Sequence, residues 1–136
     1  VWAYYPRSPP KDEEGPVRSL LPQILEEVGE GPAILGGDFN NSAHWDKPGR
    51  ADNFKDLAKE LERGGLVSAY HHFTGEEFGE ERQPTFYMQR KREKPYHLDY
   101  CFLSRDLLER VTDVRVGEYE DWIGLSDHMP LIVDLG

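Results

Sequence analysis

Short apolar runs alternate with amphipathic segments along the 136 residues of this chain. Apolar residues recur with helical spacing after Pro16, whose ring suits the first turn of a helix, and they stop before Gly29. Pro22 falls inside this segment and should restrict or kink the helix. A second amphipathic segment follows Asp52, a suitable N-cap, and ends at Gly64. The pattern therefore predicts two helices in the first half of the chain.

Six segments have the short apolar or alternating patterns of strands: residues 1–5, 33–35, 85–89, 97–103, 111–116 and 129–135. The run at 33–35 is wholly apolar between glycines, which is typical of a buried central strand. Residues 66–73 fit either a strand or a helical turn. Helices and strands alternate early and strands dominate later. The pattern thus predicts a layered α/β or α+β domain, with helices on one face of a mixed β-sheet.

Length and composition narrow the class of protein. The chain has room for one domain, and 38% hydrophobic and 12% aromatic residues suit a globular fold. Its apolar runs are far shorter than the ~20 residues of a membrane span. Nothing at the N-terminus resembles a signal peptide. The single cysteine, Cys101, excludes an internal disulfide and fits a reducing compartment, so we expect a cytoplasmic location.

The net charge of −10 disfavours non-specific binding to long nucleic acids, which usually requires a basic face. One basic cluster, at residues 90–94, interrupts the acidic chain. It is either a solvated loop or the rim of a site that attracts an anionic substrate.

The segment Gly36-Gly37-Asp38-Phe39-Asn40 carries the first candidate chemistry. If the chain stays extended, Asp38 and Asn40 project to the same side at the end of a strand, where open sheets bind ligands. The acid can hold a metal or accept a proton from water, and the amide can donate to a phosphoryl oxygen. The same residue types are also the commonest in turns.

Two more acidic positions lie near histidines. Neighbours in an extended chain point to opposite faces, so Ser126, Asp127 and His128 cannot form a serine-hydrolase triad with one another.

Alternation from His97 to Phe102 leaves Asp99 on a polar face, and an acid within such a strand needs a partner. His128 is the obvious partner. The simpler interpretation of Asp127 and His128 is a capping aspartate beside a hydrogen-bonded histidine. His44, His71 and His72 fit no zinc-binding spacing, and surface or packing roles are expected for them.

The ordered combination of Gly-Asp-Phe-Asn, an apolar-Asp-Tyr strand and Ser-Asp-His-x-Pro resembles the endonuclease/exonuclease/phosphatase superfamily over essentially the whole chain. The stretch Gln83-Pro84-Thr85-Phe86 is similar to a structural Pro-Thr-Phe/Tyr strand of that family. The resemblance implies a four-layered α/β sandwich made of two similar halves. Residues 1–136 would then be the C-terminal half of such a domain, with the N-terminal half and its principal metal ligands absent.

The resemblance also implies a role for each matching position. Asp38 would orient or deprotonate the attacking water and help to bind a metal ion. Asn40 would hydrogen-bond the phosphoryl group, Asp99 would orient His128, and His128 would stabilise the pentavalent phosphate. Asp127 would contribute to binding Mg²⁺ or Mn²⁺.

Two positions match the substrate-binding residues of the family loosely. Tyr4 stands where the family has a His or Tyr near the phosphate, and His97 replaces an arginine. We expect a metal-dependent phosphoester hydrolase, a nuclease or a phosphatase, that is weakly active as an isolated chain. Its exposed inner sheet face should then promote homodimerisation. The alternatives are a non-catalytic phosphate-binding or interaction module and an unrelated carboxylate-dyad hydrolase that uses Asp38 and Asp127.

Overall fold

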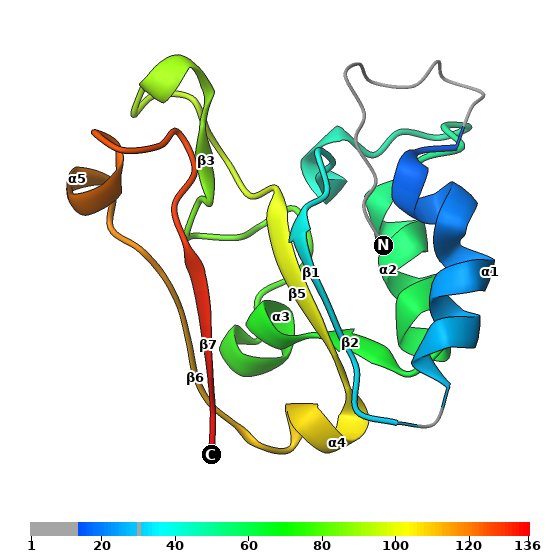
Figure 1. Cartoon of the computed structure of the whole chain (residues 1–136). Coiled ribbons are helices and arrows are strands. Elements are labelled where there is room, and N and C mark those ends of the chain that lie inside the picture. The colour runs from blue at the N-terminus through cyan, green and yellow to red at the C-terminus, as the bar shows by residue number, and fades with distance from the viewer. Residues whose placement is uncertain (1–13, 30) are drawn as a thin grey trace.

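The structure, a computed structural model, describes residues 14–29 and 31–136 (Figure 1). The predicted strand at residues 1–5 and Tyr4 lie outside this part of the chain. The described elements are, in chain order, α1 (Pro16–Val28), β1 (Ile34–Asp38), the 3₁₀ turn η1 (Ala43–Trp45), α2 (Phe54–Arg63), β2 (Leu66–Ser68), α3 (Ala69–Thr74), β3 (Phe86–Tyr87), the 3₁₀ turn η2 (Met88–Arg90), β4 (Pro95–Tyr96), β5 (Asp99–Ser104), α4 (Arg105–Leu108), β6 (Val111–Val116), α5 (Tyr119–Trp122) and β7 (Leu131–Leu135).

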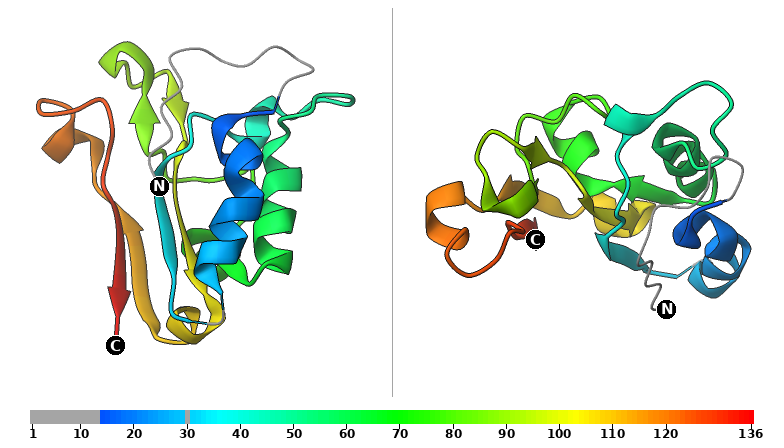
Figure 2. Two further views of the ribbon diagram at one scale, coloured as in Figure 1. Left: turned by 45° about the vertical axis from the view of Figure 1, so that its right-hand side comes forward. Right: turned by 90° about the horizontal axis from the view of Figure 1, so that it is seen from above.

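The strand β5 lies at the centre of the molecule, between β1 and β2 in a three-stranded antiparallel sheet. Helices α1 and α2 cover one face of this sheet, as the left view of Figure 2 shows. Phe102 and Tyr100 face that helical layer and join its core. Leu103 belongs to a second core, which β5 shares with α3 and the antiparallel pair β6–β7. One strand thus connects both hydrophobic cores.

The two predicted helices form, with differences in their detail. The first is one continuous helix through Pro22. The second begins after Asn53, not after the predicted N-cap Asp52. Its first backbone N–H groups donate instead to a distant carboxylate, Asp46, with distances of 2.6 Å from Phe54 N and 2.9 Å from Lys55 N. A loop residue therefore satisfies two of the orphan donors of this helix, which local capping rules do not anticipate.

The predicted α+β class is confirmed, and α1 and α2 lie on one face of the sheet. The expectation of a mixed sheet is corrected, because every strand pair among the described residues is antiparallel. The ambiguous segment 66–73 divides into β2 and α3. The run at 33–35 is not a buried central strand: β1 pairs only with β5 among the described strands, and Ile34 is 62% exposed. None of the described helices is long and apolar enough to cross a membrane.

The strand predicted at 85–89 is short because Gln89 and Arg90 take positive φ angles of 58° and 57°, which turn the chain after Tyr87. The strand predicted at 97–103 begins only at Asp99. The first correction concerns the hairpin β3–β4, and the second concerns the start of β5, which follows that hairpin in the chain (Figure 1).

Candidate active site

Three segments converge above the three-stranded sheet: the end of β1, the start of β5 and the residues that precede β7 (Figure 1). In the register of β1 with β5, Asp38 lies directly opposite Asp99. The chain before β7 is held against β3 by a bridge between Phe86 and His128, and this brings His128 to the same end of the sheet. The convergence of Asp38, Asp99 and His128 therefore follows from strand register and one bridge.

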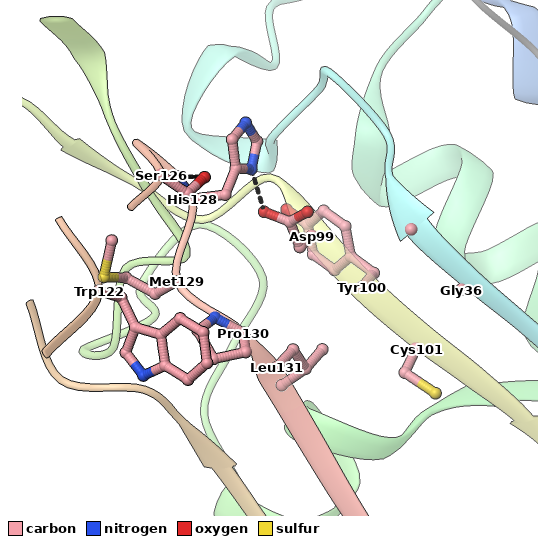
Figure 3. A pocket seen from close by; sticks show the side chains of 11 residues that line it. Gly36, Asp99, Tyr100, Cys101, Trp122, Ser126, His128, Met129, Pro130 and Leu131 are labelled. Atoms are coloured by element: carbon pink, nitrogen blue, oxygen red, sulfur yellow. Dashed lines mark hydrogen bonds and ion pairs between the residues drawn. The ribbon is translucent and has the colours of Figure 1, made fainter. Parts of the chain in front are cut away.

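His128 lies between the two carboxylates. Its Nδ1 is 2.8 Å from Asp99 Oδ2, the hydrogen bond drawn in Figure 3, and its Nε2 is 3.9 Å from Asp38 Oδ2. The side chains are partly accessible, with 31% exposure for His128, 20% for Asp99 and 32% for Asp38. The predicted pairing of Asp99 with His128 is thus present, and Nε2 of the partly exposed ring makes no hydrogen bond to a described residue.

The electrostatics of the site favour a charged imidazole. The hydrogen bond to Asp99 raises the pKa of His128, and the charges of Asp99, Asp38 and Asp127 add to this effect against partial burial. Burial raises the pKa of Asp38, and the charge of Asp99 acts in the same direction. Hydrogen bonds from Asn40 oppose that shift only partly. The site therefore combines a stabilised cation with a carboxylate that is readier than usual to take a proton.

Asn40 adopts a left-handed backbone with a φ of 48°, so the chain does not stay extended after Asp38. Its backbone N–H donates to Asp38 Oδ1 over 2.8 Å. Phe39, between them, turns into the core and is 8% exposed. The motif is therefore a turn, and the same turn places the backbone N–H of Asn40 beside the candidate carboxylate of Asp38. The turn interpretation and the functional one are compatible.

Ser126 and Asp127 act on the backbone around His128. The hydroxyl of Ser126 accepts a hydrogen bond from the N–H of His128 at 2.9 Å, and the carbonyl oxygen of Asp127 accepts one from the N–H of Tyr87 at 2.9 Å. The imidazole Nδ1 is meanwhile engaged by Asp99. The tripeptide is therefore not arranged as a catalytic triad.

His97 lies apart from this group. It is 4% exposed, its Nδ1–H donates to the carbonyl oxygen of Gln83 over 2.8 Å, and its ring packs against Tyr70 and Tyr100. Burial lowers its pKa, so the neutral form is favoured. Its Nε2 has no hydrogen-bond partner among the described residues, and the side chain lines a separate cavity of about 110 Å³. The structure thus does not bring His97 together with His128. Tyr4, the other expected substrate contact, lies outside the described residues.

Two arginines of the basic cluster at residues 90–94 hold the hairpin β3–β4 against α5 and the residues that follow it. Arg90 donates to the carbonyl oxygens of Ile123 at 3.0 Å and Gly124 at 3.2 Å. Arg92 pairs with Glu120, and its guanidinium lies 4.3 Å from the ring centroid of Tyr119. The cluster is therefore not a wholly solvated loop, and its two arginines support the segment that leads to Ser126.

An open cavity of about 440 Å³ adjoins His128 and Asp99 and extends along Gly36 and Gly37. Figure 3 shows the indole of Trp122 against Pro130 at its lower edge, with His128 above. Trp122 is not among the residues predicted from the sequence, where its only signal is an aromatic residue shortly before Ser126. The two glycines leave this part of β1 without side chains, as expected for a position that a ligand approaches.

The described residues fit a divalent metal ion only in part. Mg²⁺ and Mn²⁺ take hard oxygen ligands in a nearly octahedral arrangement. In the described part of the chain, no group of three or more histidine, cysteine, aspartate or glutamate side chains could hold a metal ion. Asp38 and Asp99 face the same imidazole instead of an open coordination centre.

A scan of the sequence against protein-family models finds no match, and a search of curated proteins finds no related sequence.

Proposed function

We propose that this chain provides the proton-transfer and phosphate-binding part of a phosphoester-hydrolase site. The observation that carries the proposal is the position of His128, held by Asp99 at 2.8 Å while Nε2 remains 3.9 Å from Asp38. That separation exceeds a hydrogen bond, so Nε2 is free to donate to an oxygen of a substrate or of water that also contacts Asp38 from beside the line joining the two groups.

The chemistry follows from the charges. Asp99 accepts the Nδ1–H of a cationic His128, whose Nε2–H then donates to a phosphoryl oxygen as negative charge develops. Asp38 accepts a proton from the attacking water, whose oxygen forms the new bond to phosphorus while the bond to the leaving oxygen breaks. The side-chain amide of Asn40 donates to the phosphoryl group without adding negative charge. Each role uses a side chain that the described site brings together.

The resemblance to the endonuclease/exonuclease/phosphatase superfamily supports the same proposal and adds a Mg²⁺ or Mn²⁺ ion. Asp127 and Asp38 would be its ligands within this chain. A bound ion would neutralise charge on the phosphoryl oxygens. Further oxygen ligands would have to come from outside the described residues, because these do not form a complete set.

For the substrate we propose a phosphodiester or phosphomonoester, with nucleic acid as one member of that class. The net charge of −10 favours a small substrate over a long polyanion. We also propose a cytoplasmic location, consistent with the unpaired Cys101. The sheet face that carries Ile34 is proposed to bind a second copy of the chain.

The decisive experiment measures Mg²⁺-dependent hydrolysis of a generic phosphodiester by the full-length protein and its His128→Ala variant. We expect the variant to lose activity by about 10²–10³-fold, the usual contribution of a donor that stabilises negative charge in the transition state. His44→Ala, which removes an exposed histidine outside the site, is the matched control. Absence of hydrolysis by the full-length protein, or full activity in His128→Ala, would refute the proposal.

One observation favours a second candidate, a phosphate-binding module without catalysis: the described residues alone form no complete metal site. Such a module would bind inorganic phosphate in a His128-dependent manner and hydrolyse nothing. Calorimetric titration with phosphate, beside the hydrolysis assay, separates the two candidates.

A further inference from the structure

Thr85 is bonded to both segments that carry the Asp99–His128 pair. It is fully buried, with 0% exposure. Its Oγ1 accepts hydrogen bonds from two consecutive backbone N–H groups, Leu98 at 2.9 Å and Asp99 at 3.0 Å. Its own carbonyl oxygen accepts the N–H of Met129 at 2.7 Å. One residue thus binds the peptide at Asp99 through its side chain and the peptide after His128 through its backbone.

The neighbouring residues of Thr85 extend this contact along the same segment. Phe86 forms a bridge with His128, and the centroids of their rings lie 4.7 Å apart. The N–H of Tyr87 donates to the carbonyl oxygen of Asp127 at 2.9 Å. The segment that presents His128 is therefore aligned against residues 85–87 over three consecutive positions, and Thr85 alone of these three has a side-chain bond to the Asp99 segment among the described contacts.

We propose that Thr85 is the positioning residue of the site: its hydroxyl fixes the peptide of Asp99, and its carbonyl fixes the approach of His128, so that the two side chains meet. This inference rests on the proposed function for its catalytic consequence, although the positioning itself does not depend on any activity.

The chemistry requires an oxygen at this position. A hydroxyl has two lone pairs, and the N–H groups of Leu98 and Asp99 use both. Valine has nearly the same shape but accepts no hydrogen bond, so Thr85→Val would leave two buried N–H groups unpaired. Thr85→Ser keeps the oxygen and loses only a methyl group. The two variants therefore separate hydrogen bonding from packing.

The chain also offers a matched control on β5, the strand whose first residue, Asp99, is bonded to Thr85. At the far end of β5, the buried Ser104 accepts a hydrogen bond from the N–H of Ala33 at 2.9 Å. Ser104→Ala removes a bond of the same type from β5 without touching the site. A general loss of stability would therefore affect this variant too, whereas a loss of positioning would not.

The experiment uses proton NMR of the ¹⁵N-labelled protein at a fixed pH near neutrality. It follows the low-field resonance of the His128 Nδ1–H that donates to Asp99, assigned by its absence in His128→Gln. We expect the resonance to disappear or shift in Thr85→Val and to persist in Thr85→Ser and Ser104→Ala. A folded Thr85→Val that keeps the resonance unchanged would overturn the proposal.

Hydrogen exchange of the unmodified protein provides a second test, which decides the question if Thr85→Val does not fold. The backbone N–H groups of Leu98 and Asp99 should be protected as strongly as those inside β5. Exchange at the rate of unstructured amides would contradict the proposal.

Activity assays then separate this proposal from the proposed function. In an active full-length protein, Thr85→Val should lower kcat by about 10–100-fold with little change in KM, because misplaced catalytic groups slow the chemical step. Equal losses of kcat in Thr85→Val and Ser104→Ala would contradict positioning. If no hydrolysis is found while the NMR results hold, the proposed function fails and the positioning role of Thr85 stands.

Discussion

Asp99 and Asp38 place negative charge near both ring nitrogens of His128. The hydrogen bond at Nδ1 can only be donated by the ring, because an ionised carboxylate accepts and does not donate. A proton at Nε2 therefore makes the imidazole cationic. The residue that carries the proposed chemistry is thus also one whose charge couples to folding.

The sign of that coupling gives the first prediction. The pKa of His128 is raised in the folded protein above its ordinary value of about 6.5. Its contribution to the free energy of unfolding is therefore present in full below about pH 6.5 and is lost as the pH rises through the raised pKa. We expect urea unfolding to show a stability difference between wild type and His128→Gln of the order of 1 kcal/mol on the acidic side, smaller at alkaline pH. His72→Gln, at an exposed position, is the control. A difference that does not vary with pH would contradict the prediction.

Asp38 gives a prediction of the opposite kind. Burial and the charge of Asp99 raise its pKa, so folded Asp38 binds its proton more tightly than in the unfolded chain. Stability should therefore fall as the pH rises from about 3.9 through the raised pKa, and the ionised carboxylate costs stability at neutral pH. Asp38→Asn should raise the free energy of unfolding at pH 7 by roughly 0.5 kcal/mol, a small value because solvent screens the partly exposed group.

The same variant should lose activity, since an amide cannot accept the proton of water. Asp56→Asn, at an exposed carboxylate in the first turn of α2, should not stabilise the protein. Destabilisation of Asp38→Asn at pH 7 would show that its interaction with His128 outweighs the cost of burial.

The sequence predicted one contact within the candidate site and did not predict the position of a neighbouring histidine. The pairing of Asp99 with His128 could be expected, because an acid within a half-apolar strand needs a partner. His97 could not be placed in the same way. Alternation put it on the same face as Asp99, but the hydroxyl of Thr85 binds the peptides of Leu98 and Asp99, and β5 begins only at Asp99. A side-chain contact from a distant segment thus ended the alternation.

At the scale of elements, the hairpin β3–β4 supports the loop that leads to His128. Its tip is strained, because Gln89 and Arg90 both take positive φ angles. The guanidinium of Arg90 offsets this strain by donating to the carbonyl oxygens of Ile123 and Gly124. The tip is therefore fixed to the chain just after α5 by an arginine of the basic cluster.

Removal of this contact gives the third prediction. In Arg90→Ala, the strain at the tip remains, because alanine also has a Cβ, while two hydrogen bonds are lost. We expect the amides of Leu125 and Ser126, which both donate to the carbonyl oxygen of Trp122, to exchange with solvent about fivefold faster, as expected for a local loss of ~1 kcal/mol. Lys91→Ala changes the adjacent exposed cation and should leave both rates unchanged. Equal effects of the two variants would mean that net charge, not the contact, holds the loop.

Element boundaries show where local rules are sufficient. Helical spacing found α1 and α2, because each buries an apolar stripe against the same core. The N-terminus of α2 was misplaced because Asp46, eight residues before Phe54, provides the acceptor. The strand at β1 was recognised by its apolar residues, but its exposure depends on which strands pair with it, and this cannot be read from residues 33–35 alone.

At the scale of the whole molecule, the central sheet is covered unequally. Helices α1 and α2 pack on one face, and β6–β7 reaches the other beside β5 and α3 (Figure 2). On the side of β1 that these elements leave open, Ile34 is 62% exposed, and Gly36 lines the cavity below His128. Among the described strands, β1 pairs only with β5, and no described strand pairs with its outer edge.

A strand edge with no described partner and an exposed apolar side chain favours self-association through a two-fold interface, in which the same surface serves both copies. We therefore expect light scattering at micromolar concentration to show a dimer. Ile34→Lys places a charge at the edge and should weaken dimerisation by at least about tenfold, the effect of a loss of ~1.4 kcal/mol. Phe73→Lys, at a 45% exposed position on α3, changes charge and hydrophobicity equally and should leave the dimer intact. A monomeric wild type would refute self-association, and equal weakening by both variants would place the interface elsewhere.

Because Gly36 belongs to the same side of β1 as Ile34, a dimer formed there would also border the cavity beside His128 and limit which substrates can enter it.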